Sequence, residues 1–123
     1  MSSKILMAVR IVFALALLFF GLNKLFHFVT PPPAPEAAWG YWKELTASNT
    51  MMLVGIVETI SGLTLILNKY AALMMVILMS VSVNAVLYHL AFDPNGLKMG
   101  GMLLILNIVM LFAYKDKYKA LLE

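Results

Sequence analysis

Long apolar runs alternate with short polar segments along this chain. The runs cover residues 5–28, 51–67, 71–92 and 97–114. Each run is close to the roughly 20 apolar residues that an α-helix needs to cross a bilayer. The pattern therefore predicts an all-α integral membrane protein with a single domain, residues 1–123, built as a bundle of four transmembrane helices.

The longest polar segment, residues 30–50, separates the first two runs. It begins with a proline-rich stretch, residues 31–35, which cannot continue a helix and which we expect to be a stiff, extended connector. Residues 36–50 are too polar to span a bilayer, and they carry three aromatic side chains that prefer the headgroup level, Trp39, Tyr41 and Trp42. We therefore expect a short interfacial helix or re-entrant cap over one end of the bundle.

The composition excludes several classes of protein. With 63% hydrophobic residues, 12% charged residues and a mean hydropathy of +0.91, the chain cannot present a water-facing surface. The net charge of +3 comes from basic residues spread over helix ends, so nucleic-acid binding is not expected. Because the chain has no cysteine, it can form neither a disulfide nor a thiol relay of its own.

The basic residues also predict the orientation in the membrane. Six of the nine fall on one side of the four runs: Lys4, Arg10, Lys69, Lys115, Lys117 and Lys119. The other three are Lys24, Lys43 and Lys98. Loops rich in Lys and Arg stay in the cytoplasm, so we expect a multi-pass protein of the cell (inner) membrane with both termini cytoplasmic. The segment 30–50 and the turn at 93–96 then face outward.

A small set of polar and ionisable residues falls inside or beside the apolar runs. A charge at the centre of a membrane helix costs roughly 2.5 to 3.5 kcal/mol on insertion scales, so such residues pair or function. At a rise of about 1.5 Å per residue, they fall in the outer half of the bundle. The main candidates for ligand binding or proton exchange are Lys24, His27, Glu58, Asn84 and His89, and the secondary candidates there are Asn23 and Asp93.

Helical spacing divides this set into pairs. Asn23 and His27 are four residues apart, as are His89 and Asp93, so each pair is expected on one helix face. Glu58 is the most costly residue, and its expected partner is Lys24 from the preceding run. Glu58 is either part of a structural ion pair, or it is a proton-exchanging acid or a ligand contact, and the sequence leaves these interpretations open.

Two further features concern packing and metals. Small residues surround Glu58 at Gly55, Thr59 and Gly62, which lets a second helix approach closely. Asn107, midway along the fourth run, must bond another helix or a ligand because no water reaches it. His27 and His89, two imidazoles on different helices at one depth, are the candidate axial ligands for haem or a metal, but no attachment or di-iron motif accompanies them. Neither haem nor metal is therefore expected.

Three short motifs follow one another along the chain: Phe20-Gly21-Leu22-Asn23-Lys24-Leu25-Phe26-His27-Phe28, then Gly55-Ile56-Val57-Glu58 with Gly62, then Asn84 and His89 before Asp93-Pro94. In this order they resemble the DoxX family of small four-helix membrane proteins. The resemblance implies a four-helix transmembrane bundle with both termini inside and links to membrane redox complexes. The recurrent polar positions of the family fall on Lys24, Glu58, Asn84 and His89.

Three functions follow as hypotheses. The chain is an accessory subunit of a quinone-linked redox system whose partner protein carries the redox centre, or a binder or carrier of a small lipophilic ligand. Alternatively it is a structural or assembly protein whose polar residues only lock the bundle. The binder requires a pocket lined by Glu58 and Asn84, and the assembly protein requires Lys24 paired with Glu58 in a packed interior. A homo-oligomer is compatible with all three.

Overall fold

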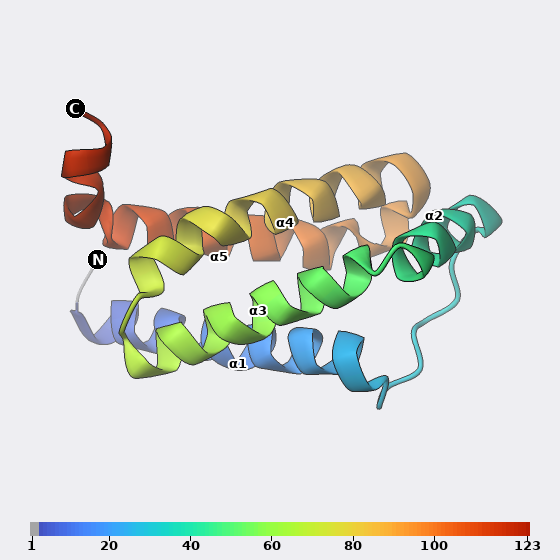
Figure 1. The fold of residues 1–123 in the computed structure, drawn as a ribbon, viewed down its shortest axis with the longest axis horizontal. Helices are drawn as coiled ribbons and strands as arrows, with labels where there is room; N and C mark the ends of the chain where they lie inside the picture. The colour runs from blue at the N-terminus through green and yellow to red at the C-terminus, as the bar shows by residue number, and fades with distance from the viewer. Residues whose placement is uncertain (1–2) are drawn as a thin grey trace.

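The computed structural model describes residues 3–123, and every regular element in this part of the chain is helical (Figure 1). The elements are α1 (Ser3–Phe26), α2 (Glu36–Ala47), α3 (Thr50–Leu67), α4 (Ala71–Phe92), η1 (Pro94–Gly96), α5 (Leu97–Ala113) and η2 (Lys115–Leu121). α1, α3, α4 and the segment Pro94–Ala113 are each long and apolar enough to cross a membrane. The predicted all-α four-helix membrane bundle is confirmed.

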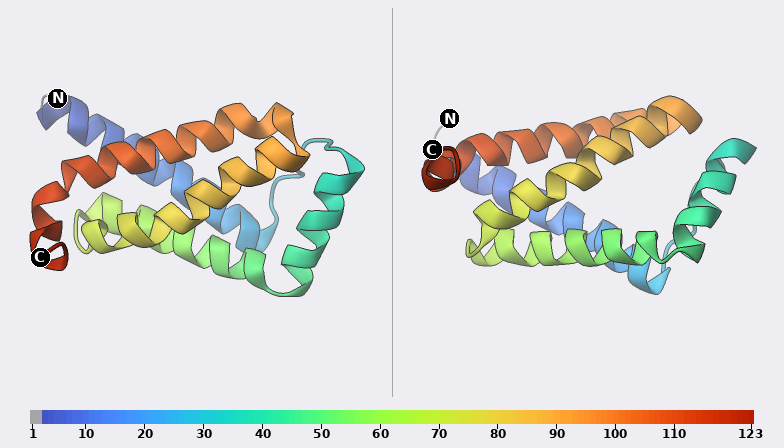
Figure 2. Two further views of the ribbon diagram at one scale, coloured as in Figure 1. Left: turned by 90° about the horizontal axis from the view of Figure 1, so that it is seen from above. Right: turned by 45° about the horizontal axis from the view of Figure 1, so that its top comes forward.

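The bundle consists of two helix pairs. α1 packs along α3, and α4 packs along α5, while a tight turn joins α3 to α4. The ribbons of α3 and α4 lie close at this turn and diverge towards the end of the bundle where α2 lies (Figure 2). The half of the bundle next to α2 is called the α2 half below, and the half next to the first turn of α1 and η2 is called the terminal half.

The apolar core occupies the terminal half. Its buried side chains come from all four spans and form one cluster: Phe13, Ala14, Leu17, Leu65, Ala71, Met75, Leu78 and Met110. The other buried residues of the described spans, apart from Met74, lie from the middle of the bundle towards α2: Gly21, Gly55, Glu58, Ser61, Gly62, Ser82, Gly100 and Asn107. All of these are glycines or polar residues. The interior of the α2 half therefore offers little apolar packing and most of the buried chemistry.

The first span ends two residues earlier than the sequence analysis predicted, at Phe26 instead of residue 28. His27 adopts a left-handed conformation with φ of 54°, and its N–H donates to the Asn23 carbonyl at 2.7 Å. Thr30 precedes Pro31, and a residue before proline is sterically driven out of the helical conformation. A left-handed closing residue and the following prolines therefore end α1.

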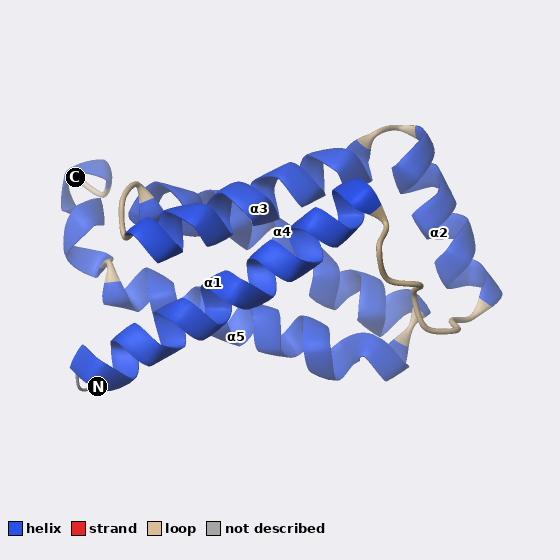
Figure 3. Ribbon diagram, turned by 90° about the horizontal axis from the view of Figure 1, so that it is seen from below, coloured by secondary structure: helices blue, strands red, loops and turns tan. Residues whose placement is uncertain are grey.

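The segment between α1 and α3 has the predicted two parts (Figure 3). An extended connector leads to α2, which lies across the end of the bundle. Tyr41 of α2 stacks on two rings of α4, with ring centroids 5.6 Å from Tyr88 and 5.2 Å from Phe92. Such aromatic pairs contribute about 0.5–1.5 kcal/mol beyond their buried area. Stacking therefore holds the short helix against α4.

Candidate functional site

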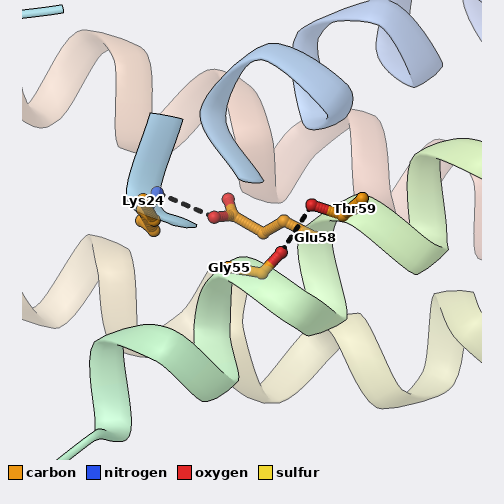
Figure 4. A network of polar contacts seen from close by, with 4 residues as sticks. All are labelled: Lys24, Gly55, Glu58 and Thr59. Atoms are coloured by element: carbon orange, nitrogen blue, oxygen red, sulfur yellow. Dashed lines mark hydrogen bonds and ion pairs between the residues drawn. The ribbon is translucent and has the colours of Figure 1, made fainter. Parts of the chain in front are cut away.

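An ion pair joins α1 to α3 in the α2 half (Figure 4). Lys24 lies in the last turn of α1, and its Nζ is 2.7 Å from Oε1 of Glu58, which lies two turns inside α3. The Glu58 side chain is 3% exposed, whereas that of Lys24 is 18% exposed. The carboxylate is therefore enclosed by protein, and the ammonium forms the accessible side of the pair.

Three glycines make this enclosure possible, and we call Gly21, Gly55 and Gly62 the glycine seam. A methyl group on Gly21 would lie 2.7 Å from the Thr59 backbone nitrogen and 2.8 Å from the Gly55 oxygen. A methyl group on Gly62 would lie 2.9 Å from the Ala14 oxygen. The backbones of α1 and α3 are thus in direct contact, the arrangement that small residues at membrane helix interfaces permit.

Aromatic rings border the accessible side of the ion pair. The Lys24 ammonium lies 5.7 Å from the centroid of the Phe20 ring, within the range of a cation–π contact. Phe19 packs edge-on against Phe20 at 5.4 Å and against Phe28 at 5.8 Å. The ammonium consequently lies over Phe20, which belongs to a cluster of three phenyl rings at the end of α1.

A second buried polar group lies on the same face of α3 as Glu58. Ser61 is three residues further along and fully buried, and its hydroxyl has no hydrogen-bond partner among residues 3–123. A buried hydroxyl left without a partner costs about 1–3 kcal/mol. Such a group in a folded protein calls for a further polar partner, such as water or part of a ligand.

His89 occupies a different place, between α4 and α5. Its Nδ1 lies 3.1 Å from the Asp93 carbonyl oxygen and 3.9 Å from Oδ2 of the same residue, so the predicted pairing of the two residues is present. A methyl group on Gly100 would lie 2.7 Å from the His89 ring, and one on Gly96 would also collide with it. The imidazole therefore fills the space that Gly96 and Gly100 leave at the start of α5.

The remaining candidate residues from the sequence analysis do not contact the ion pair. Asn84 is exposed on α4, and its Nδ2 donates to the Ser80 carbonyl of its own helix at 2.7 Å. His27 is exposed beyond the end of α1, so it does not share a helical face with Asn23. Asn23 accepts the Val29 N–H at 2.9 Å. Within residues 3–123 no three His, Cys, Asp or Glu side chains group as metal ligands.

Asn107 is a link between helices, one of the two roles that the sequence analysis allowed. Its Oδ1 accepts from the Ser82 hydroxyl at 2.7 Å, and its Nδ2 donates to the Met75 carbonyl at 3.0 Å. All of these groups are buried between α4 and α5. The partner Ser82 was not predicted, because a single serine within an apolar run carries no distinctive signal.

This link yields a measurable coupling. We expect Ser82→Ala and Asn107→Leu to destabilise the fold individually, and their combination to cost less than the sum of the single changes. Coupling between side chains inside membrane proteins averages about 0.6 kcal/mol and reaches about 1.7 kcal/mol. A double-mutant cycle on the free energy of unfolding in mixed micelles measures it. Strict additivity would show that the two residues do not interact.

The four spans define a multi-pass membrane protein of the four-helix-bundle class, with one buried ion pair between its first and second spans. Comparison of the chain with models of protein families, with curated proteins and with solved structures finds no match.

Proposed function

We propose that this chain is a DoxX-like protein of the cell inner membrane, with cytoplasmic termini, that serves as an accessory subunit of a quinone-linked redox system. The observation that carries the proposal is a buried carboxylate whose lysine partner is partly exposed at the surface of the bundle. Glu58 is enclosed between α1 and α3, and Lys24 presents its ammonium beside phenyl rings. We assign these two residues as the polar site for a quinone headgroup.

The chemistry of the pair fits such a ligand. A quinone is apolar enough to move within the bilayer, and its carbonyl oxygens accept hydrogen bonds from an ammonium. Lys24 has three N–H donors, of which the contact with Glu58 uses one. A flat ring can pack on the phenyl rings next to the ammonium. The ion pair and the nearby unpaired Ser61 hydroxyl therefore supply polar partners on one side of an apolar ligand.

In this proposal a partner protein transfers the electrons and this chain transfers a proton. Reduction of a quinone consumes two electrons and two protons. This chain has no cysteine, so in this proposal a partner redox protein delivers the electrons. The Lys24 ammonium donates to one carbonyl oxygen and passes one proton to it, while Glu58 holds the ammonium in place. The second proton reaches the other oxygen from water.

The test uses the full chain purified in mild detergent and a short-tailed 1,4-benzoquinone. We expect native mass spectrometry to detect the quinone on the wild-type protein, and Glu58→Gln to weaken its apparent affinity by about tenfold. One charged hydrogen bond contributes about 1.5–3 kcal/mol, and 1.4 kcal/mol corresponds to a factor of ten. Thermal unfolding of the same samples separates loss of binding from loss of fold.

Glu44→Gln is the matched control, because it makes the same chemical change at an exposed position of α2. It should leave the affinity unchanged. The proposal fails if no quinone binds the wild-type protein, or if Glu58→Gln and Glu44→Gln bind quinone equally well.

A structural or assembly role is the second candidate, and the glycine seam favours it. Backbone contact along α1 and α3, with Lys24 closing over Glu58, is also the arrangement that would lock two helices together. In that case substitutions of the ion pair change only the stability of the fold, and no quinone adds to the wild-type mass. The binder that would use Asn84 lacks such support, since that residue lies exposed on α4 and bonds its own helix.

A further inference from the structure

Two hollows open at the terminal half of the bundle, away from the ion pair. The smaller has a volume of about 160 Å³ and the larger about 230 Å³. Asn68, in the turn after α3, and Tyr114, at the end of α5, line both of them. Lys117 of η2 lines the smaller hollow, and Arg10 of α1 lines the larger one. Each is many times larger than the space that one water molecule requires.

Hydrogen bonds fix the walls of these hollows. The Tyr114 hydroxyl donates to Oδ1 of Asn68 at 2.6 Å, and the Tyr118 hydroxyl donates to the Ala72 carbonyl at 2.8 Å. The second bond ties η2 to the start of α4 and so places Lys117 at the rim. Burial raises the pKa of the Tyr114 phenol, against a smaller lowering by the Arg10 guanidinium. The phenol therefore stays neutral at physiological pH.

The charge around the hollows is positive. Arg10 donates through Nη1 alone, to the carbonyls of Leu65 and Ile66 at the end of α3. Its other three N–H donors have no partner among residues 3–123. No acidic residue lines either hollow. Of the two acidic residues in the C-terminal segment, Asp116 lies 3.5 Å from Lys119, an exposed pair on η2.

We propose that the two hollows form a site for the phosphate group of an anionic phospholipid in the leaflet at the terminal half. The Arg10 guanidinium and the Lys117 ammonium are groups that bind phosphate, and the Asn68 amide Nδ2 on the wall of both hollows is a further donor. Basic pockets between membrane helices on the cytoplasmic side bind anionic headgroups, and the predicted orientation places this end in the cytoplasmic leaflet. Arg10 holds the phosphate in the larger hollow, and Lys117 lines the adjoining smaller hollow on the other side of the shared Tyr114–Asn68 wall.

The test compares phosphatidylglycerol, phosphatidylcholine and inorganic phosphate, each titrated into the full chain in mild detergent while thermal unfolding is recorded. We expect phosphatidylglycerol to raise the unfolding temperature and phosphatidylcholine to leave it unchanged. Lys117→Gln should weaken the apparent affinity for phosphatidylglycerol about fivefold, since one basic residue near an anionic surface contributes about 1 kcal/mol. Stabilisation by inorganic phosphate alone would also support the site and identify a free anion as its ligand.

Lys98→Gln is the matched control, because it removes the same charge from an exposed lysine at the opposite end of α5. It should leave the affinity unchanged. Arg10→Gln should weaken binding further, but it also removes the bonds to the end of α3, so Lys117→Gln decides if that variant does not fold. The proposal is overturned if phosphatidylcholine stabilises as strongly as phosphatidylglycerol, if neither lipid nor phosphate stabilises, or if both lysine variants lose the same affinity.

Discussion

Lys24→Met is expected to lower the free energy of unfolding by about 3–5 kcal/mol, the usual effect of removing one partner from a buried ion pair. The physical reason is the asymmetry of the pair: Glu58 is 3% exposed and cannot reach water when its cation is gone. Glu58→Gln should cost much less, because the Lys24 ammonium is 18% exposed and can turn outward to water or headgroups. Unfolding in mixed micelles, followed by circular dichroism, measures both variants.

The double variant Lys24→Met with Glu58→Gln separates charge from shape. If the loss in Lys24→Met comes from the unpaired carboxylate, the added Glu58→Gln change restores most of the stability. Lys98→Met is the control, since it makes the same substitution at an exposed lysine. Equal losses in Lys24→Met and Lys98→Met would contradict a structural contribution from the ion pair. A double variant as unstable as Lys24→Met would show that the methionine itself disturbs the packing.

Gly21→Ala is expected to destabilise the bundle by about 1–3 kcal/mol or more, the range for overpacking a filled interior. The added methyl group meets the backbone of α3 at Thr59 and Gly55, and backbone atoms cannot move aside as a flexible side chain can. The helices must separate, which also pulls Lys24 away from Glu58. The free energy of unfolding and the quinone affinity should therefore fall together in this variant.

Gly101→Ala provides the comparison, because a methyl group there meets nothing within 4 Å. Alanine is the better helix former by about 0.8–1.0 kcal/mol, so this variant should be neutral or slightly more stable. Similar destabilisation by both substitutions would rule out close packing at Gly21 as the cause.

The four spans could be predicted almost to the residue, because the length of each apolar run is fixed by the bilayer and its ends by prolines and turn residues. Residues 71–92 were predicted and observed as one helix, and the fourth span ended one residue early, at Ala113. The end of α1 was wrong by two residues. His27 ends the helix by adopting a left-handed backbone conformation, and the pattern of apolar residues does not predict such a local change.

For the candidate site, the sequence predicted only the depth at which each residue lies in the membrane. Depth follows from counting residues, and it placed Lys24 opposite Glu58, where the ion pair occurs. Which way each helix face turns depends on packing against its neighbours, and that information was missing for Asn84, which is exposed. Arg10 was treated as a basic residue at a membrane edge, and its bonds to the end of α3 were not foreseen.

Two of the three cationic residues of α1, Arg10 and Lys24, bear on how the chain inserts into the membrane. In lipid, the most demanding groups of α3 are the Glu58 carboxylate and the carbonyls of its last turn. Lys24 meets the first, and Arg10 meets the carbonyls of Leu65 and Ile66. Because α1 is synthesised first, α3 enters a membrane that already holds both of its partners on one preceding helix. The order of the helices along the chain thus places the polar partners of α3 in the membrane before α3 itself inserts.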